Sequence, residues 1–89
     1  MPEITLTIHH AVGLHARPAA LFVQTAKQFR SNLKVIHGAK EANGKSILNV
    51  LALGVDQDAA ITLQAEGEDA DQALAALKNL IENNFGEKA

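Results

Sequence analysis

Apolar and polar residues alternate along two stretches of the chain, a spacing that is typical of half-buried β-strands. In residues 3–8 every second side chain is an isoleucine or a leucine, and residues 60–66 repeat the alternation. Two shorter stretches, residues 33–37 and 40–42, predict further strands joined by a turn that contains glycine. We therefore expect four strands in one sheet.

Apolar residues recur every three or four positions in two other stretches, the spacing of amphipathic helices. The first helix is predicted to start at Pro18, whose missing N–H costs nothing in a first turn, and to end at residues 31–32. The second helix is predicted to follow Asp69 and to end around residues 84–86. Asp69 and Gln72 together resemble a capping box at its start.

A third, short helix is predicted over residues 47–53, with Ser46 as its N-cap and Gly54 directly after it. The elements then follow in the order β-α-β-β-α-β-α, which contains a split βαβ arrangement. This order predicts an α+β open-faced β-sandwich, in which a mainly antiparallel four-stranded sheet carries three helices on one face. The length suits one small domain, which we expect to span residues 1–89.

The composition excludes several classes of protein. Because the chain has no cysteine, it has no disulfide scaffold, thiol catalyst or Cys-ligated zinc. A net charge of −2 and only three aromatic residues, all Phe, give no reason to expect direct nucleic-acid binding. No apolar run is long enough for a membrane span, and Met1-Pro2-Glu3 begins no signal peptide, so we expect a cytoplasmic protein without membrane insertion.

The segment with the clearest chemistry runs from Gly13 to Pro18 and has the sequence Gly-Leu-His-Ala-Arg-Pro. His15 precedes a predicted helix start, where free N–H groups and the positive end of the helix dipole attract anions. Arg17 adds a guanidinium that suits phosphate oxygens. Positive surroundings favour a neutral imidazole, which has a nucleophilic nitrogen. The residues alone indicate either a transient phosphohistidine or a helix cap beside a solvated arginine.

Two other motifs support no metal or cofactor. Gly44-Lys45-Ser46 matches the end of a P-loop, but Ala39 stands where the first glycine is required. The four histidines lack ligand spacing on a helix and an obvious carboxylate partner. His9 and His10 are instead expected at the surface, where the first strand ends. We therefore predict neither a bound metal nor a cofactor.

Residues 13–20, Gly-Leu-His-Ala-Arg-Pro-Ala-Ala, and the Leu-Phe-Val-Gln-Thr-Ala that follows resemble the active-site helix of HPr. HPr is the histidine phosphocarrier family of the bacterial phosphoenolpyruvate–sugar phosphotransferase system. Lys45-Ser46-Ile47 and Leu53-Gly54 resemble a second block of that family, and the resemblance covers essentially the whole chain.

The resemblance implies that His15 accepts a phosphoryl group on Nδ1 from phosphorylated enzyme I and donates it to the IIA unit of a sugar permease. Arg17 and the amides at the helix start would stabilise the transferring group, since phosphoryl transfer depends mainly on in-line positioning and charge stabilisation. The protein would be a monomeric, stoichiometric carrier rather than a turnover enzyme.

Ser46 has a regulatory role if the resemblance holds. In many Gram-positive members an ATP-dependent serine kinase phosphorylates the matching serine, so a kinase/phosphorylase of this kind is an expected partner. The added charge would impede phosphorylation at His15. The phosphoserine form can act as a corepressor with a catabolite-control transcription factor, in carbon catabolite regulation. Here Leu48 and Leu51 replace the methionines common in that block, and Asn49 replaces a small residue.

The resemblance also implies a docking surface for the protein partners. From spacing alone, its apolar members could equally be core, because the sheet needs to be covered. Lys27, Lys40 and Lys45 would add positive charge at its rim and steer acidic partners. The expected docking surface comprises Ala16, Pro18, Ala20, Gln24, Lys27, Ile47, Leu48 and Leu51.

Three alternative functions remain open at the level of sequence. One is a regulatory, corepressor-type binding protein on the same fold, although such relatives typically lack the histidine that matches His15. Another is a paralogue that serves a nitrogen-regulatory phosphorelay by the same chemistry. The third is a small-molecule-binding domain of similar topology.

Overall fold

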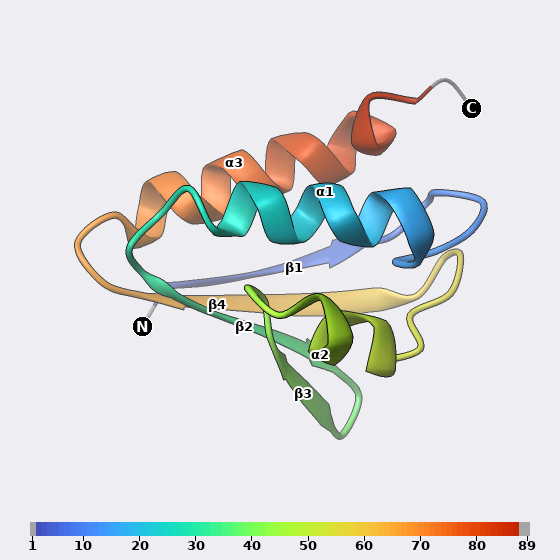
Figure 1. The fold of residues 1–89 in the computed structure, drawn as a ribbon, viewed down its shortest axis with the longest axis horizontal. Coiled ribbons are helices and arrows are strands. Elements are labelled where there is room, and N and C mark those ends of the chain that lie inside the picture. The colour runs from blue at the N-terminus through green and yellow to red at the C-terminus, as the bar shows by residue number, and fades with distance from the viewer. Residues whose placement is uncertain (1, 88–89) are drawn as a thin grey trace.

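The computed structural model describes residues 2–87 and contains one four-stranded sheet (Figure 1). The strands lie in the order β1-β4-β2-β3, and each pair of neighbours is antiparallel. The last strand in the chain therefore inserts between the first and the second. The strands are β1 (Glu3–Thr7), β2 (Asn32–His37), β3 (Lys40–Asn43) and β4 (Ala60–Glu66).

Three helices lie on one side of this sheet, which confirms the predicted α+β open-faced sandwich (Figure 1). They are α1 (Ala16–Ala26), α2 (Ile47–Ala52) and α3 (Ala70–Glu82), and the 3-10 turn η1 (Asn84–Gly86) follows. Helices α1 and α3 run side by side over the sheet, whereas α2 packs against the edge strand β3 and contacts α1. Within residues 2–87, no helix has the length and apolar character needed to cross a membrane.

Burial follows the periodicities of the sequence. In β4 every second residue is buried, so one face of the strand supports the helices and the other faces outward. In α3 the predicted apolar stripe is buried except at Leu80, which is half-buried. Phe22 of α1 is fully buried, and burying a side chain of this size stabilises a fold by about 2 kcal/mol. The buried apolar side chains form one hydrophobic core.

Helix α1 begins and ends earlier than predicted. Its first turn starts at Ala16 because the amide of Ala19 donates to the carbonyl of His15, 3.3 Å away. The helix ends at Ala26, and Phe29, which falls inside the predicted helix range, packs half-buried against the core from the turn that follows.

The predicted capping box at Asp69 is wrong. The Asp69 side chain makes no cap hydrogen bond to α3. Its carboxylate instead accepts the backbone N–H groups of Arg30 and Ser31, both at 2.9 Å, and also the Ser31 hydroxyl. Asp69 therefore ties the start of α3 to the turn between α1 and β2, because donors from that turn occupy the oxygens that a cap would use.

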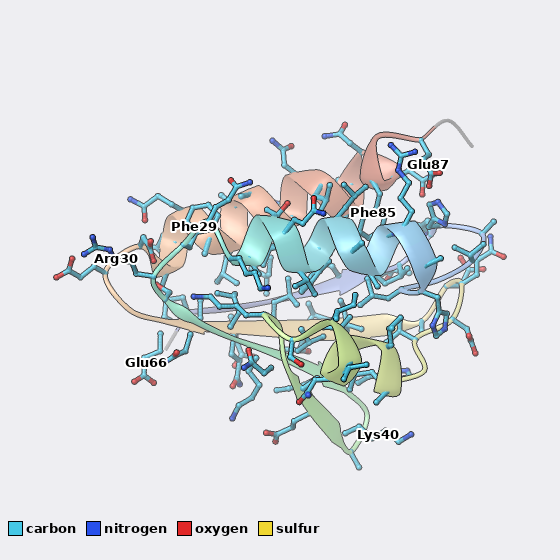
Figure 2. All side chains as sticks on the ribbon, viewed as in Figure 1. Phe29, Arg30, Lys40, Glu66, Phe85 and Glu87 are labelled. Atoms are coloured by element: carbon cyan, nitrogen blue, oxygen red, sulfur yellow. The ribbon has the colours of Figure 1, made fainter. Side chains whose placement is uncertain are left out.

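His10 is also placed differently from the prediction, because its ring is buried. Nε2 contacts the Glu87 carboxylate, and Nδ1 accepts the amide of Val12 at 3.2 Å. The ring packs edge-on against Phe85, with 5.9 Å between ring centroids. Figure 2 shows Phe85 and Glu87 beyond the end of α3, close to the start of α1. Only His9 is exposed, as predicted.

The carboxylate of Asp69 makes stability depend on pH. Hydrogen bonds from the Ser31 hydroxyl and then from the Arg30 amide lower the pKa of Asp69 from 3.8 to about 2. A lowered folded-state pKa contributes stability above the unfolded value, and this contribution disappears as pH falls through the folded value. We therefore expect Asp69→Asn to lower the urea midpoint of unfolding at pH 7.

The difference between wild type and Asp69→Asn should shrink as pH falls from about 4 to about 2. The matched control is Asp71→Asn, which neutralises an acidic residue in the same first turn of α3 without touching the α1–β2 turn. A pH-independent difference, or an equal loss in the control, would contradict the role assigned to Asp69.

Candidate functional site

The loop before α1 is held against the loop before β4 by backbone hydrogen bonds. The amide of Ile8 donates to the carbonyl of Ala59, and the amide of Leu14 donates to the carbonyl of Val55, both at 2.9 Å. The Leu14 side chain is fully buried and anchors the first loop in the core. The backbone that carries the next residue, His15, is therefore fixed relative to the second loop.

Gly13 permits this close approach. Its φ of +71° lies in the left-handed region, and a Cβ there would stand 2.3 Å from the carbonyl oxygen of Val55 and 2.7 Å from Cα of Asp56. Both neighbouring atoms belong to the backbone, so neither can turn away. Glycine is required at this position for two reasons, its φ and the space available.

His15 occupies the N-cap position of α1, and its side chain is 35% exposed. Its Nε2 lies 3.3 Å from Oδ1 of Asp56, which is itself almost fully exposed. The prediction of positive surroundings for His15 is therefore incomplete, because a carboxylate lies beside the ring. Asp56 carries no recognisable motif in the sequence. The sequence feature connected with Asp56 is Gly13, whose backbone lies against Val55 and Asp56 in the structure.

The first turn of α1 offers unpaired donors next to His15. A helix leaves its first N–H groups without intrahelical acceptors, and here these belong to Ala16 and Arg17, because Pro18 has no N–H. Ala16 has a φ of +48°, an unusual value for a residue with a Cβ. Arg17 is exposed and, among residues 2–87, forms no ion pair. An imidazole, two amides and a guanidinium thus belong to three consecutive residues.

Ser46 caps α2 as predicted. Its Oγ accepts the backbone N–H of Asn49 at 3.3 Å and the side-chain amide of the same residue at 3.0 Å. Ser46 itself is only half-buried. The hydroxyl therefore has a structural role in the helix and remains partly open to solvent.

The apolar residues of the expected docking surface are not core. Leu48 is 75% exposed, and Ile47 and Leu51 are 39% and 37% exposed, while Val50 is the buried residue of α2. On α1 the expected members differ in burial, since Pro18 is fully buried and supports the helix start rather than adding to the exposed surface. Ala16, Gln24 and Lys27 are exposed, and Ala20 is half-buried.

The three lysines of the predicted rim lie on different parts of the molecule. Nζ of Lys45 donates to the carbonyl of Phe29 at 2.6 Å, so this lysine ties the α2 side of the molecule to the turn after α1. Lys40 lies at the turn of the β2–β3 hairpin, away from α1 (Figure 2). Lys40 and Leu48 nevertheless line the same hollow beside α2, and Lys27 directly follows α1.

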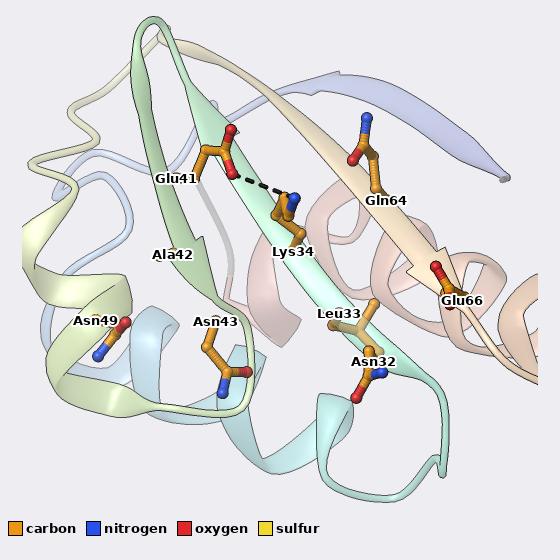
Figure 3. Close-up of a pocket in the computed structure, with 9 residues that line it drawn as sticks. All are labelled: Asn32, Leu33, Lys34, Glu41, Ala42, Asn43, Asn49, Gln64 and Glu66. Atoms are coloured by element: carbon orange, nitrogen blue, oxygen red, sulfur yellow. Dashed lines mark ion pairs between the residues drawn. The ribbon is translucent and has the colours of Figure 1, made fainter.

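A hollow of about 480 Å³ lies elsewhere, against the strands β2, β3 and β4 (Figure 3). Nζ of Lys34 and Oε1 of Glu41 form an ion pair across part of it, at 3.2 Å. None of the predicted site residues lines the hollow, so it is separate from the His15 site. Within residues 2–87 no group of three or more His, Asp or Glu side chains could hold a metal ion. The residues around the hollow are Asn32, Leu33, Lys34, Glu41, Ala42, Asn43, Asn49, Gln64 and Glu66.

A small open-faced sandwich with a partly exposed histidine at a helix start that offers free amides has the features of a histidine phosphocarrier. The family model described as "PTS HPr component phosphorylation site" matches residues 2–83. The phosphocarrier protein HPr of Mycoplasma capricolum is 45% identical over 78 residues, 88% of each chain. The chain belongs to the HPr family.

Solved structures agree with this membership. An HPr of Thermoanaerobacter tengcongensis is 49% identical, with a TM-score of 0.98 over all of both chains. Crh, the catabolite repression protein of Bacillus subtilis, is 37% identical, with a TM-score of 0.75 over 94% of this chain and 97% of Crh. As a member of the family, the chain is a phosphocarrier of the phosphotransferase system that accepts a phosphoryl group on a histidine, and enzyme I and IIA units are the partners of that family.

The contact at Gly13 leads to a stability prediction. Gly13→Ala should destabilise the fold by roughly 2–4 kcal/mol, because a left-handed φ and a backbone collision both act against the new Cβ. The matched control is Gly38→Ala, where φ is +62° but nothing lies within 4 Å of the new Cβ. The control should cost only about 1 kcal/mol. Equal losses in urea unfolding would show that the close approach at Gly13 adds nothing.

Proposed function

We propose that His15 is the histidine that accepts the phosphoryl group from phosphorylated enzyme I and donates it to IIA units of sugar permeases. The observation that carries this assignment is its place at the open start of α1, beside unpaired amides and the Arg17 guanidinium. None of the other three histidines lies at a helix start. His9 is paired with Asp58, His10 with Glu87, and Nδ1 of His37 with a backbone carbonyl.

The chemistry that this site needs is mainly electrostatic. A phosphoryl group in transfer spreads negative charge over its oxygens, and positioned donors stabilise that charge. The amides of Ala16 and Arg17 and the guanidinium of Arg17 are suited to this task. The protein needs no further catalytic group, because the donor and acceptor proteins supply the other half of each site. This supports a stoichiometric carrier, and we assign no cofactor.

The docking surface is proposed as the contact with enzyme I and IIA units. Exposed leucines on α2, which contacts α1, provide apolar area for a protein partner, and Leu48 is the most exposed of them. Lys27 would attract acidic partners. We infer a monomer acting in the cytoplasm as one domain, residues 1–89.

We further propose that phosphorylation of Ser46 regulates the carrier, through a serine kinase/phosphorylase and a catabolite-control transcription factor. Ser46 is partly open and is followed directly by Ile47 and Leu48, both exposed. A phosphate there would place nearly two negative charges at the edge of an apolar contact surface and repel acidic partners. Docking for transfer to His15 would then be weakened.

The alternatives use the same fold and are distinguished by the site. A purely regulatory protein on this fold would need Ser46 but not a phosphoryl-accepting histidine, so the presence of His15 and Arg17 favours the carrier. A nitrogen-regulatory phosphorelay would use the same histidine chemistry with other partners. Transfer from enzyme I therefore tests the assignment most directly.

His15→Ala should abolish the formation of an acid-labile phosphate adduct when the protein is incubated with phosphoenolpyruvate and enzyme I. Intact mass before and after acid treatment measures the adduct. The fold should be retained, because the His15 side chain is not part of the core. The control is His9→Ala, which removes an exposed histidine from the same loop and should leave one phosphate per chain. Residual phosphorylation of His15→Ala would refute the assignment.

Ser46→Asp should slow phosphorylation at His15 by about tenfold at low ionic strength, through repulsion at the docking surface. Ser46→Asn is the matched control, since Asn has nearly the same shape as Asp, caps helices well and adds no charge. The control should keep the wild-type rate in the enzyme I assay. If Ser46→Asp also keeps it, the regulatory proposal fails.

A further inference from the structure

We propose that Asp56 is a positioning residue for His15, which selects the ring nitrogen that receives the phosphoryl group. The inference rests on the assignment of His15 as the phosphoryl acceptor. Oδ1 of Asp56 lies 3.3 Å from Nε2 of His15, within hydrogen-bond distance. The carboxylate can only accept, so the shared proton belongs to Nε2. Nδ1 is then left with its lone pair free.

The contact is held in place by the backbone rather than by the two side chains alone. Leu14 and Val55, the residues that precede His15 and Asp56, share a hydrogen bond of 2.9 Å. Gly13 lies so close to Cα of Asp56 that even a methyl group would collide. The backbone contacts between the two loops therefore fix the position of the imidazole relative to the carboxylate.

Fixing the proton on Nε2 has a direct consequence for the transfer step. A neutral imidazole has one protonated and one free nitrogen, and only the free one is a nucleophile. The Nδ1 lone pair forms the new N–P bond, while the bond between phosphorus and the donor breaks and its electron pair leaves with the donor. The proton on Nε2 stays in place throughout, so no proton has to be transferred.

The carboxylate also complements the charge that develops on the ring. Once Nδ1 has used its lone pair and Nε2 keeps its proton, the imidazole ring carries a positive charge. Asp56 faces this charge at contact distance, although its exposure means that water and salt screen the attraction. The amides at the helix start act on the phosphoryl oxygens, whereas Asp56 acts on the opposite nitrogen of the ring.

A second His–Asp pair on the same two loops provides the control. Nδ1 of His9 lies 3.4 Å from Oδ1 of Asp58, and both side chains are about three-quarters exposed. Asp58 has a φ of +68°, a conformation that Asn tolerates well. Asp58→Asn therefore removes the same charge from the same loop without touching His15.

The test compares Asp56→Ala, Asp56→Asn and Asp58→Asn by two measurements. Long-range ¹H–¹⁵N spectra at alkaline pH give the tautomer of His15, and a rapid-mixing assay gives the rate of phosphorylation by phosphorylated enzyme I. Asp56→Ala should increase the Nδ1–H form and lower the rate by about twofold to fivefold, the range of an exposed ion pair. Asp56→Asn, which keeps an oxygen acceptor but no charge, should keep the Nε2–H form and show an intermediate rate. Asp58→Asn should match wild type in both.

Three results would overturn the proposal. They are an unchanged tautomer in Asp56→Ala, a shifted tautomer with an unchanged rate, and an equal loss of rate in Asp58→Asn. Failure of the His15 assignment itself would look different, because wild type would then accept no phosphate on His15 while the spectra still reported the contact with Asp56.

Discussion

The backbone contact between the loop before α1 and the loop before β4 is the constraint on which the rest of the site depends. It joins Leu14 to Val55 by a hydrogen bond and needs the absence of a side chain at Gly13. Because this contact is made by the backbone, it sets the position of His15 without using any side chain that the chemistry needs. The imidazole, the helix amides and Arg17 can remain accessible, and Asp56 reaches His15 from the opposing loop.

The same division between support and function appears elsewhere in the molecule. Asp69 ties the start of α3 to the turn after α1, and the pair of His10 and Glu87 ties the residues after η1 to the loop before α1. These polar contacts lie at the periphery of the core and reinforce segments that Leu14, Phe29 and Phe85 also hold by apolar packing. Titratable groups that look like candidates for catalysis in the sequence thus serve the fold, which leaves His15 as the histidine beside open donors.

Helix α2 shows how a short amphipathic element can serve a partner surface. Six residues make fewer than two turns, and Val50 alone of them is buried in the core. The sheet is already covered by α1 and α3, so the outer residues of α2 stay exposed at the edge beside β3. The cap at Ser46 stabilises a helix whose outer face is apolar, and this places a modifiable hydroxyl next to that surface.

The sequence by itself determined the local features of this protein. Alternation with a period of two located the strands, a period of 3.6 located the helices, and the Gly-Leu-His-Ala-Arg-Pro segment indicated His15 and Arg17, because each signal lies within a few residues of chain. The tertiary structure alone decided the strand order, the exposure of Leu48, the burial of His10 and the partners of Asp56 and Asp69. The contacts of Asp56 and Asp69 join residues that are 41 and 39 positions apart in the chain. Periodicity and capping preferences are local, so they contain no information about which distant donor a carboxylate binds.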